Sequence, residues 1–400
     1  MPVGTPALPM IRKIAILGST GSIGRQCFSV VESLAGDFEV VSMAAGGNVE
    51  LAAAQAAKHR PKLVSVAMQA GAKEMGDRLR AAKVSPLPEI LYGPEGIEQV
   101  ATHPDAEIVV SAAVGVVGLR ATYKAVLAGK TLALANKEVL VAAGELVMAA
   151  AKKNGVAVLP VDSEHNAIHQ CLRAGESGEV KRLVLTASGG PFRKTPLAQL
   201  KKVTPKQALA HPNWRMGQRI TIDSATMMNK GFEVIEARWL FGLDLERIEV
   251  IIHPQSTIHS MVEYVDGSIL AQLGPTDMRM PIQYALTYPL RVASNGCALN
   301  WSELKKLEFE PVPDKKFPCL QLAREAAQKG GPVPCALNAA DEEAVAAFLQ
   351  RKLTFTGIAA VIERALEKMP GRALHSIEDV LDADSEARRL ARQEIARRKN

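Results

Sequence analysis

Short β-branched runs alternate with alanine-rich stretches between Ile11 and about Val161. The apolar runs are continuous rather than alternating, as in strands covered on both faces. They predict strands at 14–17, 40–44, 63–66, 108–111, 131–135 and 156–161. Strands alternating with helices of this length are typical of βαβ units. We therefore expect an α/β fold whose N-terminal domain, 1–161, is a Rossmann-like parallel sheet that binds a nucleotide.

The pattern changes after Asp162. Strand-like runs at 183–186 and 248–252 lead into polar turns, and 257–265 and 268–273 flank the dipeptide Asp266-Gly267. An Asp-Gly pair between two such runs predicts a hairpin. The segment 162–293 is therefore expected to form a central domain of mixed α+β structure with antiparallel pairing.

The last quarter of the chain is predicted to be helical. The segment 294–317 has little periodicity and is interpreted as a linker, and 318–400 is expected to form a C-terminal helical bundle. Asn338 and Thr356 are predicted helix N-caps. Two pairs at i, i+4 spacing support the last helix, Asp384 with Arg388 and Glu394 with Arg398.

Composition narrows the class of protein. Four hundred residues, 48% hydrophobic and 22% charged, predict a globular protein of two or three domains. The net charge of +6 is accompanied by only 4% aromatic residues, and no basic cluster is interleaved with them. This argues against nucleic acid and favours a small anionic substrate.

Cysteine usage and hydropathy bear on location. The five cysteines form no CxxC pair, which indicates a reducing compartment, the cytoplasm. The apolar stretches 108–119 and 139–151 are too short, or are broken, for a membrane span, so no membrane partner is expected. The segment 1–10 is uncharged and proline-rich and is interpreted as a disordered leader.

A glycine-rich turn follows the first predicted strand. Gly18, Gly21 and Gly24 are spaced GxxGxxG and open a helix, the context in which backbone N–H groups face a pyrophosphate. The alternative is a tight turn without a ligand. The second strand ends at Gly46-Gly47-Asn48, without the acid that binds the ribose of NAD. NADP is therefore favoured weakly, since no Arg or Lys stands there either.

Two carboxylates follow the last predicted strand of this half. Asp162 and Glu164 are spaced i, i+2, so in an extended segment they point to one side. Oxygen ligands suit Mg²⁺ or Mn²⁺. The alternative is a solvated acidic turn that caps a helix starting near Asn166. A zinc site at His165 and His169 is disfavoured, because the HExxH order is absent.

Three further groups of residues carry candidate chemistry. Asn136-Lys137-Glu138 follows a predicted strand, where ligands bind in open α/β sheets, although a helix-start pair is equally consistent. Asn229, Lys230 and Glu233 share one face of a helix predicted from Ser224 onward, which suits a phosphorylated sugar and a metal, or a solvated ion pair. The loop 211–217 has breakers at both ends and is interpreted as a lid, with Trp214 and Met216 as core anchors as the alternative. Cys171 has no activating neighbour in sequence.

Together these motifs resemble the 1-deoxy-D-xylulose 5-phosphate reductoisomerase family. The resemblance rests on seven ordered motifs: GSTGSIG, NKE, VDSEHNAI, the turn at 188–190, HPNWxMG, DSATMMNKGFE and HPQSxIHS. It runs from about Ile11 to the final helix. It implies that 162–293 is the central α+β catalytic domain, which binds metal and substrate. It also implies a homodimer that uses NADPH and Mg²⁺ or Mn²⁺, or Co²⁺, to convert 1-deoxy-D-xylulose 5-phosphate to 2-C-methyl-D-erythritol 4-phosphate in isoprenoid biosynthesis.

The resemblance also implies roles for individual residues. The metal ligands would be Asp162, Glu164 and Glu233. The catalytic residues would be Glu164, Lys230, Glu233 and His211. The substrate contacts would be Lys137, Ser163, Glu164, Ser188, His211, Trp214, Ser224, Asn229, Lys230 and Glu233, with His259 nearby. The NADP contacts would be Gly18, Ser19, Thr20, Gly21, Ser22, Ile23, Gly46, Gly47, Asn48, Asn136, Glu138 and Gly217.

Two positions depart from the family pattern. Gly47 stands where Lys or Arg is common, which removes one contact to the 2′-phosphate of NADP, and His169 stands where an apolar residue is usual. Two rival functions remain as alternatives. Another NAD(P)-dependent sugar-phosphate or semialdehyde dehydrogenase would need an activated Cys or a Lys or His base, and a nucleotide sensor would not need the carboxylates.

Overall fold

The computed structural model describes residues 10–113, 115–214, 216–293, 298–313 and 315–398. The predicted leader lies almost wholly outside the described residues, as do 294–297 and 314 of the predicted linker. The chain forms two compact units: 1–139 with 147–166 and 277–297, and 140–146 with 167–276 and 298–400.

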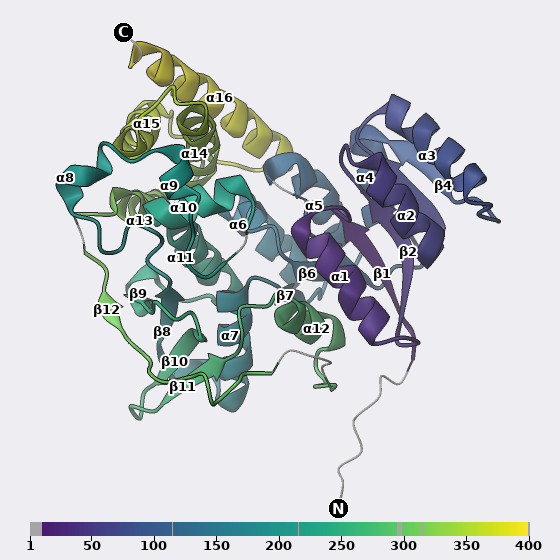
Figure 1. The fold of residues 1–400 in the computed structure, drawn as a ribbon, viewed down its shortest axis with the longest axis horizontal. Coiled ribbons are helices and arrows are strands. Elements are labelled where there is room, and N and C mark those ends of the chain that lie inside the picture. Colours follow the sequence, from purple (N-terminus) through teal and green to yellow (C-terminus); the bar gives the residue numbers. More distant parts are fainter. Residues whose placement is uncertain (1–9, 114, 215, 294–297, 314, 399–400) are drawn as a thin grey trace, which may run out of the picture. The chain divides into compact units, whose positions relative to one another are not determined.

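The first unit is built on a seven-stranded sheet (Figure 1). Its strands are β1 (Arg12–Leu17), β2 (Phe38–Ala44), β3 (Leu63–Val66), β4 (Glu89–Tyr92), β5 (Ile108–Ser111), β6 (Thr131–Leu134) and β7 (Val158–Pro160), in the order β4-β3-β2-β1-β5-β6-β7. All neighbouring strands pair in parallel. The predicted doubly wound sheet is confirmed, and the order reverses between β1 and β5, where such sheets bind ligands.

Helices follow the strands and cover the sheet. They are α1 (Ser22–Ser33), α2 (Val49–His59), α3 (Gln69–Ala81), α4 (Gly93–Ala101), α5 (Leu119–Leu127), α6 (Glu138–Lys153), α7 (Ser163–Cys171) and α12 (Arg279–Thr287). Residues 140–146 of α6 and 167–171 of α7 belong to the second unit. α12 joins the core of this unit through Ile282, Ala285 and Leu286. Arg12 fixes its end, because Nη1 donates to the carbonyls of Leu286 at 2.8 Å and Tyr288 at 2.9 Å.

The second unit has a mixed sheet of five strands. They are β8 (Val180–Ala187), β9 (Ile248–Ile252), β10 (Ile258–Tyr264), β11 (Ile269–Leu273) and β12 (Glu310–Pro311), in the order β11-β10-β8-β9-β12. β10 and β11 pair antiparallel on either side of Asp266-Gly267, so the predicted hairpin is confirmed. β8 and β9 are parallel, and β12, within the predicted linker, adds an antiparallel edge.

Helices complete this unit. They are α8 (Leu197–Leu200), α9 (Pro205–Ala208), α10 (Gln218–Thr226), α11 (Met228–Phe241), α13 (Pro318–Lys329), α14 (Val333–Leu349), α15 (Phe355–Lys368) and α16 (Ile377–Arg397). α14, α15 and α16 pack on one another, as expected of a helical bundle (Figure 1). Both predicted N-caps are wrong: Asn338 lies inside α14, and Thr354, rather than Thr356, caps α15 by accepting from the amide of Gly357 at 3.2 Å.

Candidate functional site

The glycine turn lies at the carboxyl end of β1. Gly18 has φ +85°, and a Cβ there would lie 2.5 Å from the carbonyl oxygen of Ala112, just after β5. A Cβ on Gly24 would lie 2.4 Å from the carbonyl oxygen of Gly18. The backbone is therefore packed too closely for side chains. The first amides of α1 have no partner within the helix and favour an anion, so this turn fits the pyrophosphate of a dinucleotide.

The predicted cofactor residues of the turn differ in exposure. Gly21 and Ser22 are exposed, Thr20 and Ile23 are half-buried, and Ser19 is fully buried. The amides of Gly18 and Ser19 both donate to the carbonyl of Ala44 at 2.9 Å. These two amides thus fasten the turn to β2, and the helix-start amides remain the better candidates for phosphate.

The end of β2 offers open space. Gly46, Gly47 and Asn48 are exposed, and a Cβ on either glycine would meet no atom within 4 Å. Asn48 also has a structural role, because its side chain caps α2 by accepting from the amide of Leu51 at 3.0 Å. The sequence interpretation assigned only its cofactor role.

Asn136 and Lys137 are both buried beyond the end of β6. The Asn136 amide donates to the carbonyls of Ala113 and, at 2.8 Å, Gly115, while its oxygen accepts from the amide of Glu138 at 3.1 Å. Lys137 Nζ lies 2.8 Å from Asp162 Oδ2. Asn136 therefore shapes the loop after β5, and Lys137 brings a positive charge to the carboxylate pair.

The carboxylates do not lie in an extended segment, so that part of the prediction is wrong, but their convergence is confirmed, because an oxygen of Asp162 and an oxygen of Glu164 lie within 4.8 Å of each other. α7 begins at Ser163, and the backbone carbonyl of Asp162 accepts from the amide of Asn166 at 2.8 Å. Asp162 therefore stands at the start of the helix, and Glu164 lies in its first turn. Ser163 Oγ donates to Glu164 Oε2 at 2.5 Å. The partial positive charge at the start of a helix stabilises acidic side chains, which explains why Asp162 and Glu164 can lie so close together there.

In the second unit, His211 links two serines. Its Nε2 lies 3.0 Å from Ser188 Oγ and 3.1 Å from Ser224 Oγ. Its Nδ1 accepts from the amides of Asn213 at 3.2 Å and Trp214 at 3.0 Å. Burial lowers the pKa of His211. The imidazole is therefore neutral at pH 7 with its proton on Nε2, and one N–H and two hydroxyls converge, as a phosphate requires.

The turn after β8 brings these groups close. Gly189 and Gly190 have φ of +78° and +62°. A Cβ on Gly190 would lie 2.8 Å from the carbonyl oxygen of Ser224. The Gly190 amide also donates to Ser188 Oγ at 3.2 Å. Only a glycine there allows the serine of the turn to approach the serine of α10.

α11 carries the predicted polar face. Asn229 Nδ2 donates to Glu233 Oε1 at 2.6 Å, and Lys230 Nζ donates to Glu233 Oε2. Glu233 is fully buried and Lys230 nearly so. The shared face is confirmed, and the alternative of a solvated surface is wrong. The helix does not run on from Ser224, because Met227, with φ +64°, separates α10 from α11.

The loop 211–217 leads into α10, with Gly217 as the N-cap. Asn213 Nδ2 donates to the carbonyl of Pro254 at 2.5 Å and to Ser256 Oγ at 3.1 Å. The Trp214 ring lies 6.3 Å from the His259 ring. The loop is thus held at Asn213 and places its tryptophan beside the histidine of β10.

A charged cluster around Arg219 was missed by sequence reasoning. Asn338, Asp341 and Glu342 lie on one face of α14, at i, i+3 and i+4, and contact the Arg219 guanidinium. The i, i+3 and i+4 spacing of these residues can be read from the sequence. However, the interpretation of Asn338 as an N-cap places the start of the helix there, so the three residues are not recognised as one face.

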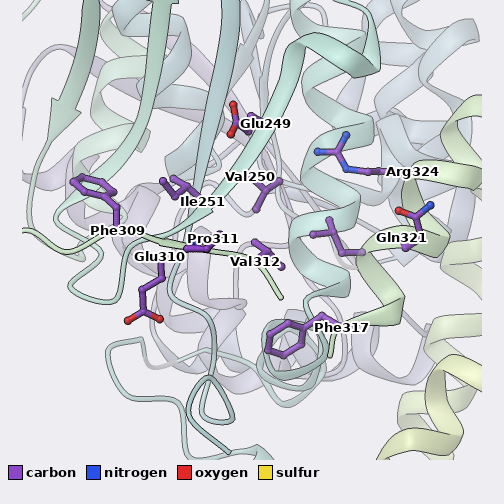
Figure 2. A pocket seen from close by; sticks show the side chains of 11 residues that line it. Glu249, Val250, Ile251, Phe309, Glu310, Pro311, Val312, Phe317, Gln321 and Arg324 are labelled. Atoms are coloured by element: carbon purple, nitrogen blue, oxygen red, sulfur yellow. The ribbon is translucent and has the colours of Figure 1, made fainter. Parts of the chain in front are cut away.

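A separate cavity of about 690 Å³ lies in the second unit. Figure 2 shows Val250, Val312 and Phe317 within it, with Glu249 and Arg324 toward one end. Glu249 pairs with Arg182, and Arg324 donates to two backbone carbonyls. No predicted site residue lines this cavity, and these charged groups already have protein partners, so it carries no assigned chemistry.

The comparisons with known proteins cover almost the whole chain. Residues 14–144 match the model of 1-deoxy-D-xylulose 5-phosphate reductoisomerase, and 158–241 and 273–390 match two models of its C-terminal domain. The enzymes of that name from Solibacter usitatus and Anaeromyxobacter sp. (strain K) are 52% and 51% identical to it. These alignments cover 96% and 97% of this chain and 97% and 98% of the relatives.

Solved structures agree with this result. The Zymomonas mobilis enzyme in complex with NADPH is 42% identical, with a TM-score of 0.90 over 96% of this chain and 99% of that one. A DOX-P reductoisomerase in complex with NADPH, fosmidomycin and magnesium is 40% identical, also with a TM-score of 0.90, over 96% of this chain and 98% of that one. The chain belongs to the 1-deoxy-D-xylulose 5-phosphate reductoisomerase family.

Proposed function

We propose that this protein converts 1-deoxy-D-xylulose 5-phosphate to 2-C-methyl-D-erythritol 4-phosphate with NADPH and Mg²⁺ or Mn²⁺, in isoprenoid biosynthesis. Family membership over nearly the whole chain supports this activity. The observation that carries the residue assignment is the buried Glu233, held by Lys230 and Asn229 on α11. A buried carboxylate with an ammonium and an amide beside it suits a divalent ion and a polar substrate.

We assign the metal ligands to Asp162, Glu164 and Glu233. Their donors are all carboxylate oxygens, which fits a hard ion rather than zinc. When bound, the metal would supply a Lewis acid that polarises the ketone and the neighbouring hydroxyl of the substrate. We assign two further residues to hold the substrate near these carboxylates. They are Lys137, which forms an ion pair with Asp162, and Ser163, which donates a hydrogen bond to Glu164.

The phosphate of the substrate is assigned to Ser188, Ser224, Asn229 and Lys230, with His211. Both hydroxyls already lie within hydrogen-bond distance of the neutral His211 N–H. Binding energy at the phosphate is remote from the reacting carbons and orients them. Trp214 and the rest of the loop 211–217 would exclude water from the aldehyde formed by the rearrangement.

The dinucleotide is assigned to the turn 18–23, to Gly46, Gly47 and Asn48, and to Asn136, Glu138 and Gly217. The glycine turn at 18–24 supports the phosphate contacts, because its backbone is packed too closely for a Cβ at Gly18 or Gly24. NADPH would supply the hydride that reduces the aldehyde. Because Gly47 offers no cation to a 2′-phosphate, we expect the preference for NADPH over NADH to be modest.

The four cysteines that the structure describes do not support a cysteine-dependent dehydrogenase. Cys27, Cys171, Cys319 and Cys335 are buried, and burial raises the pKa of the Cys27 thiol to about 12. Burial raises the pKa values of Cys319 and Cys335 as well. A nucleophilic cysteine needs the opposite shift.

The assay is NADPH oxidation with 1-deoxy-D-xylulose 5-phosphate, with Mg²⁺, with Mn²⁺ and with chelator. Glu233→Gln should lower kcat/KM at least about a hundredfold, because it removes a charged ligand but keeps the shape. Glu246→Gln, an exposed glutamate of the same unit, is the matched control. Turnover that survives chelation, or an undiminished Glu233→Gln variant, would overturn the assignment.

We further propose a cytoplasmic homodimer. β11 is an edge strand, and Ile269 and Leu270 on it are 55% and 38% exposed. An apolar edge of this kind is usually covered by another chain, and a second copy gives a closed contact. No described helix is long and apolar enough to cross a membrane. Light scattering should give a dimer mass, lost in Leu270→Lys but kept in Met68→Lys, and cell fractionation would test the location.

A further inference from the structure

α10 is a short helix whose position depends on contacts with the surrounding residues. It has nine residues, follows the loop 211–217 directly, and carries Ser224 near its other end. A helix of this length is not stable alone, so contacts with the rest of the unit decide where it lies. Its end is fixed by the left-handed Met227 and by the close approach of Gly190. Its beginning needs a separate anchor.

Arg219, in the first turn of α10, makes contacts that fit this need. Its Nη1 donates to Glu342 Oε1 and its Nη2 to Asn338 Oδ1, both at 2.6 Å. Nη2 also lies 3.5 Å from Asp341 Oδ2, and the guanidinium lies 5.9 Å from the Phe232 ring centroid. The planar guanidinium thus donates hydrogen bonds to two residues of α14 at once, and the single ammonium of a lysine cannot reproduce this geometry.

The α14 side of this contact is buried and has further partners of its own. Asn338 and Asp341 are fully buried, and α14 packs on α16. Glu342 Oε2 pairs with Arg388 of α16 at 2.5 Å, and Arg388 pairs with Asp384 at 2.6 Å. Arg219 therefore connects α10 to a network that extends through the C-terminal helices.

Asp223 lies on the same side of α10 and precedes Ser224 directly. Its Oδ2 lies 3.6 Å from Arg219 Nε, and Asp223 and Asp341 both interact with the Arg219 guanidinium. Burial raises the pKa of Asp341 to about 6, against the attraction of Arg219. Two buried carboxyls and one guanidinium thus share the space beside Ser224, so loss of the guanidinium would leave two acids facing each other.

We propose that Arg219 is a positioning residue for substrate binding. Its hydrogen bonds hold α10 against α14, and this keeps the Ser224 hydroxyl beside the His211 Nε2–H, where the substrate phosphate binds. This inference rests on the proposed function, because it takes Ser224 and His211 as phosphate contacts. Arg219 acts through α10 and is not itself a substrate contact.

The test is steady-state kinetics of Arg219→Met and Arg219→Lys. In Arg219→Met, the KM for 1-deoxy-D-xylulose 5-phosphate should rise about tenfold, while the KM for NADPH stays unchanged, because only the phosphate contact is displaced. Arg219→Lys should recover part of the loss, since it keeps the charge. In the double variant with Ser224→Ala, the rise in KM should be smaller than the product of the two single effects.

Arg392→Met is the matched control, because Arg392 pairs with Glu343 of the same bundle at an exposed position. A merely structural role of Arg219 would lower kcat and the melting temperature and leave both KM values unchanged. An unchanged substrate KM in both Arg219 variants, with normal wild-type turnover, would overturn this inference alone. Absence of wild-type turnover would overturn the proposed function as well.

Discussion

Replacing Asp341 by asparagine should change how stability depends on pH. Asp341 is fully buried, and burial raises its pKa from the usual 3.8 to about 6. Its charged neighbours are Arg219 and Asp223 on α10 and Glu342 on its own helix. The folded protein therefore binds this proton more tightly than the unfolded chain does. The contribution of Asp341 to the free energy of unfolding must then fall as pH rises from about 4 through about 6.

The size of this fall follows from the two pKa values. At about 1.4 kcal/mol for each pH unit, the interval from 3.8 to about 6 corresponds to about 3 kcal/mol. An asparagine side chain at this position carries no charge at any pH and keeps an oxygen toward Arg219. The Asp341→Asn variant should therefore match the wild type near pH 4 and exceed its stability by up to about 3 kcal/mol above pH 7.

The assay is urea unfolding of both proteins at several pH values between 4 and 8, followed by circular dichroism. Asp382→Asn, an exposed aspartate of α16, controls for the change in net charge. A variant that is less stable than the wild type at pH 8 would refute the reasoning, since it would mean that the ionised Asp341 stabilises the fold. So would a pH dependence equal to that of the control.

Three further substitutions follow from the packing. Gly24→Ala places a Cβ 2.4 Å from a backbone oxygen and should raise the KM for NADPH at least about tenfold, measured against an unchanged substrate KM. Gly144→Ala places a Cβ 2.3 Å from the Trp239 ring and should lower the unfolding free energy by about 1–3 kcal/mol, measured in urea. Thr354→Ala removes the N-cap of α15 and should cost about 1 kcal/mol in the same assay, whereas Thr356→Ala should not.

The sheet of the first unit could be predicted because its central strands are buried on both faces. Every residue of β3 and β5 is buried, and so are the last four residues of β1. Strands of this kind appear in the sequence as continuous β-branched runs. β4 was not predicted. Its sequence Glu-Ile-Leu-Tyr is exposed at both ends, as befits an edge strand, and gives neither a continuous nor an alternating pattern.

Helix caps were less predictable, because several residues near a helix start satisfy the same rule. Thr354 and Thr356 both precede the apolar face of α15, and only the backbone geometry selects Thr354. Asn338 resembles a cap by type, yet it lies within α14 and accepts from Arg219, which is 119 residues away. Long-range partners of this kind leave no local trace in the sequence.

The candidate site shows why structural and functional interpretations of one residue need not compete. Asp162 was weighed as a helix cap against a metal ligand, and its backbone carbonyl does accept from Asn166 at the start of α7. Its carboxylate is engaged elsewhere, with Lys137 Nζ at 2.8 Å. The backbone carbonyl therefore belongs to the first turn of the helix, while the side chain already faces a cation. A divalent ion at Asp162 would replace or share that positive charge without breaking this backbone hydrogen bond, so the place of Asp162 at the helix start is no argument against the metal role.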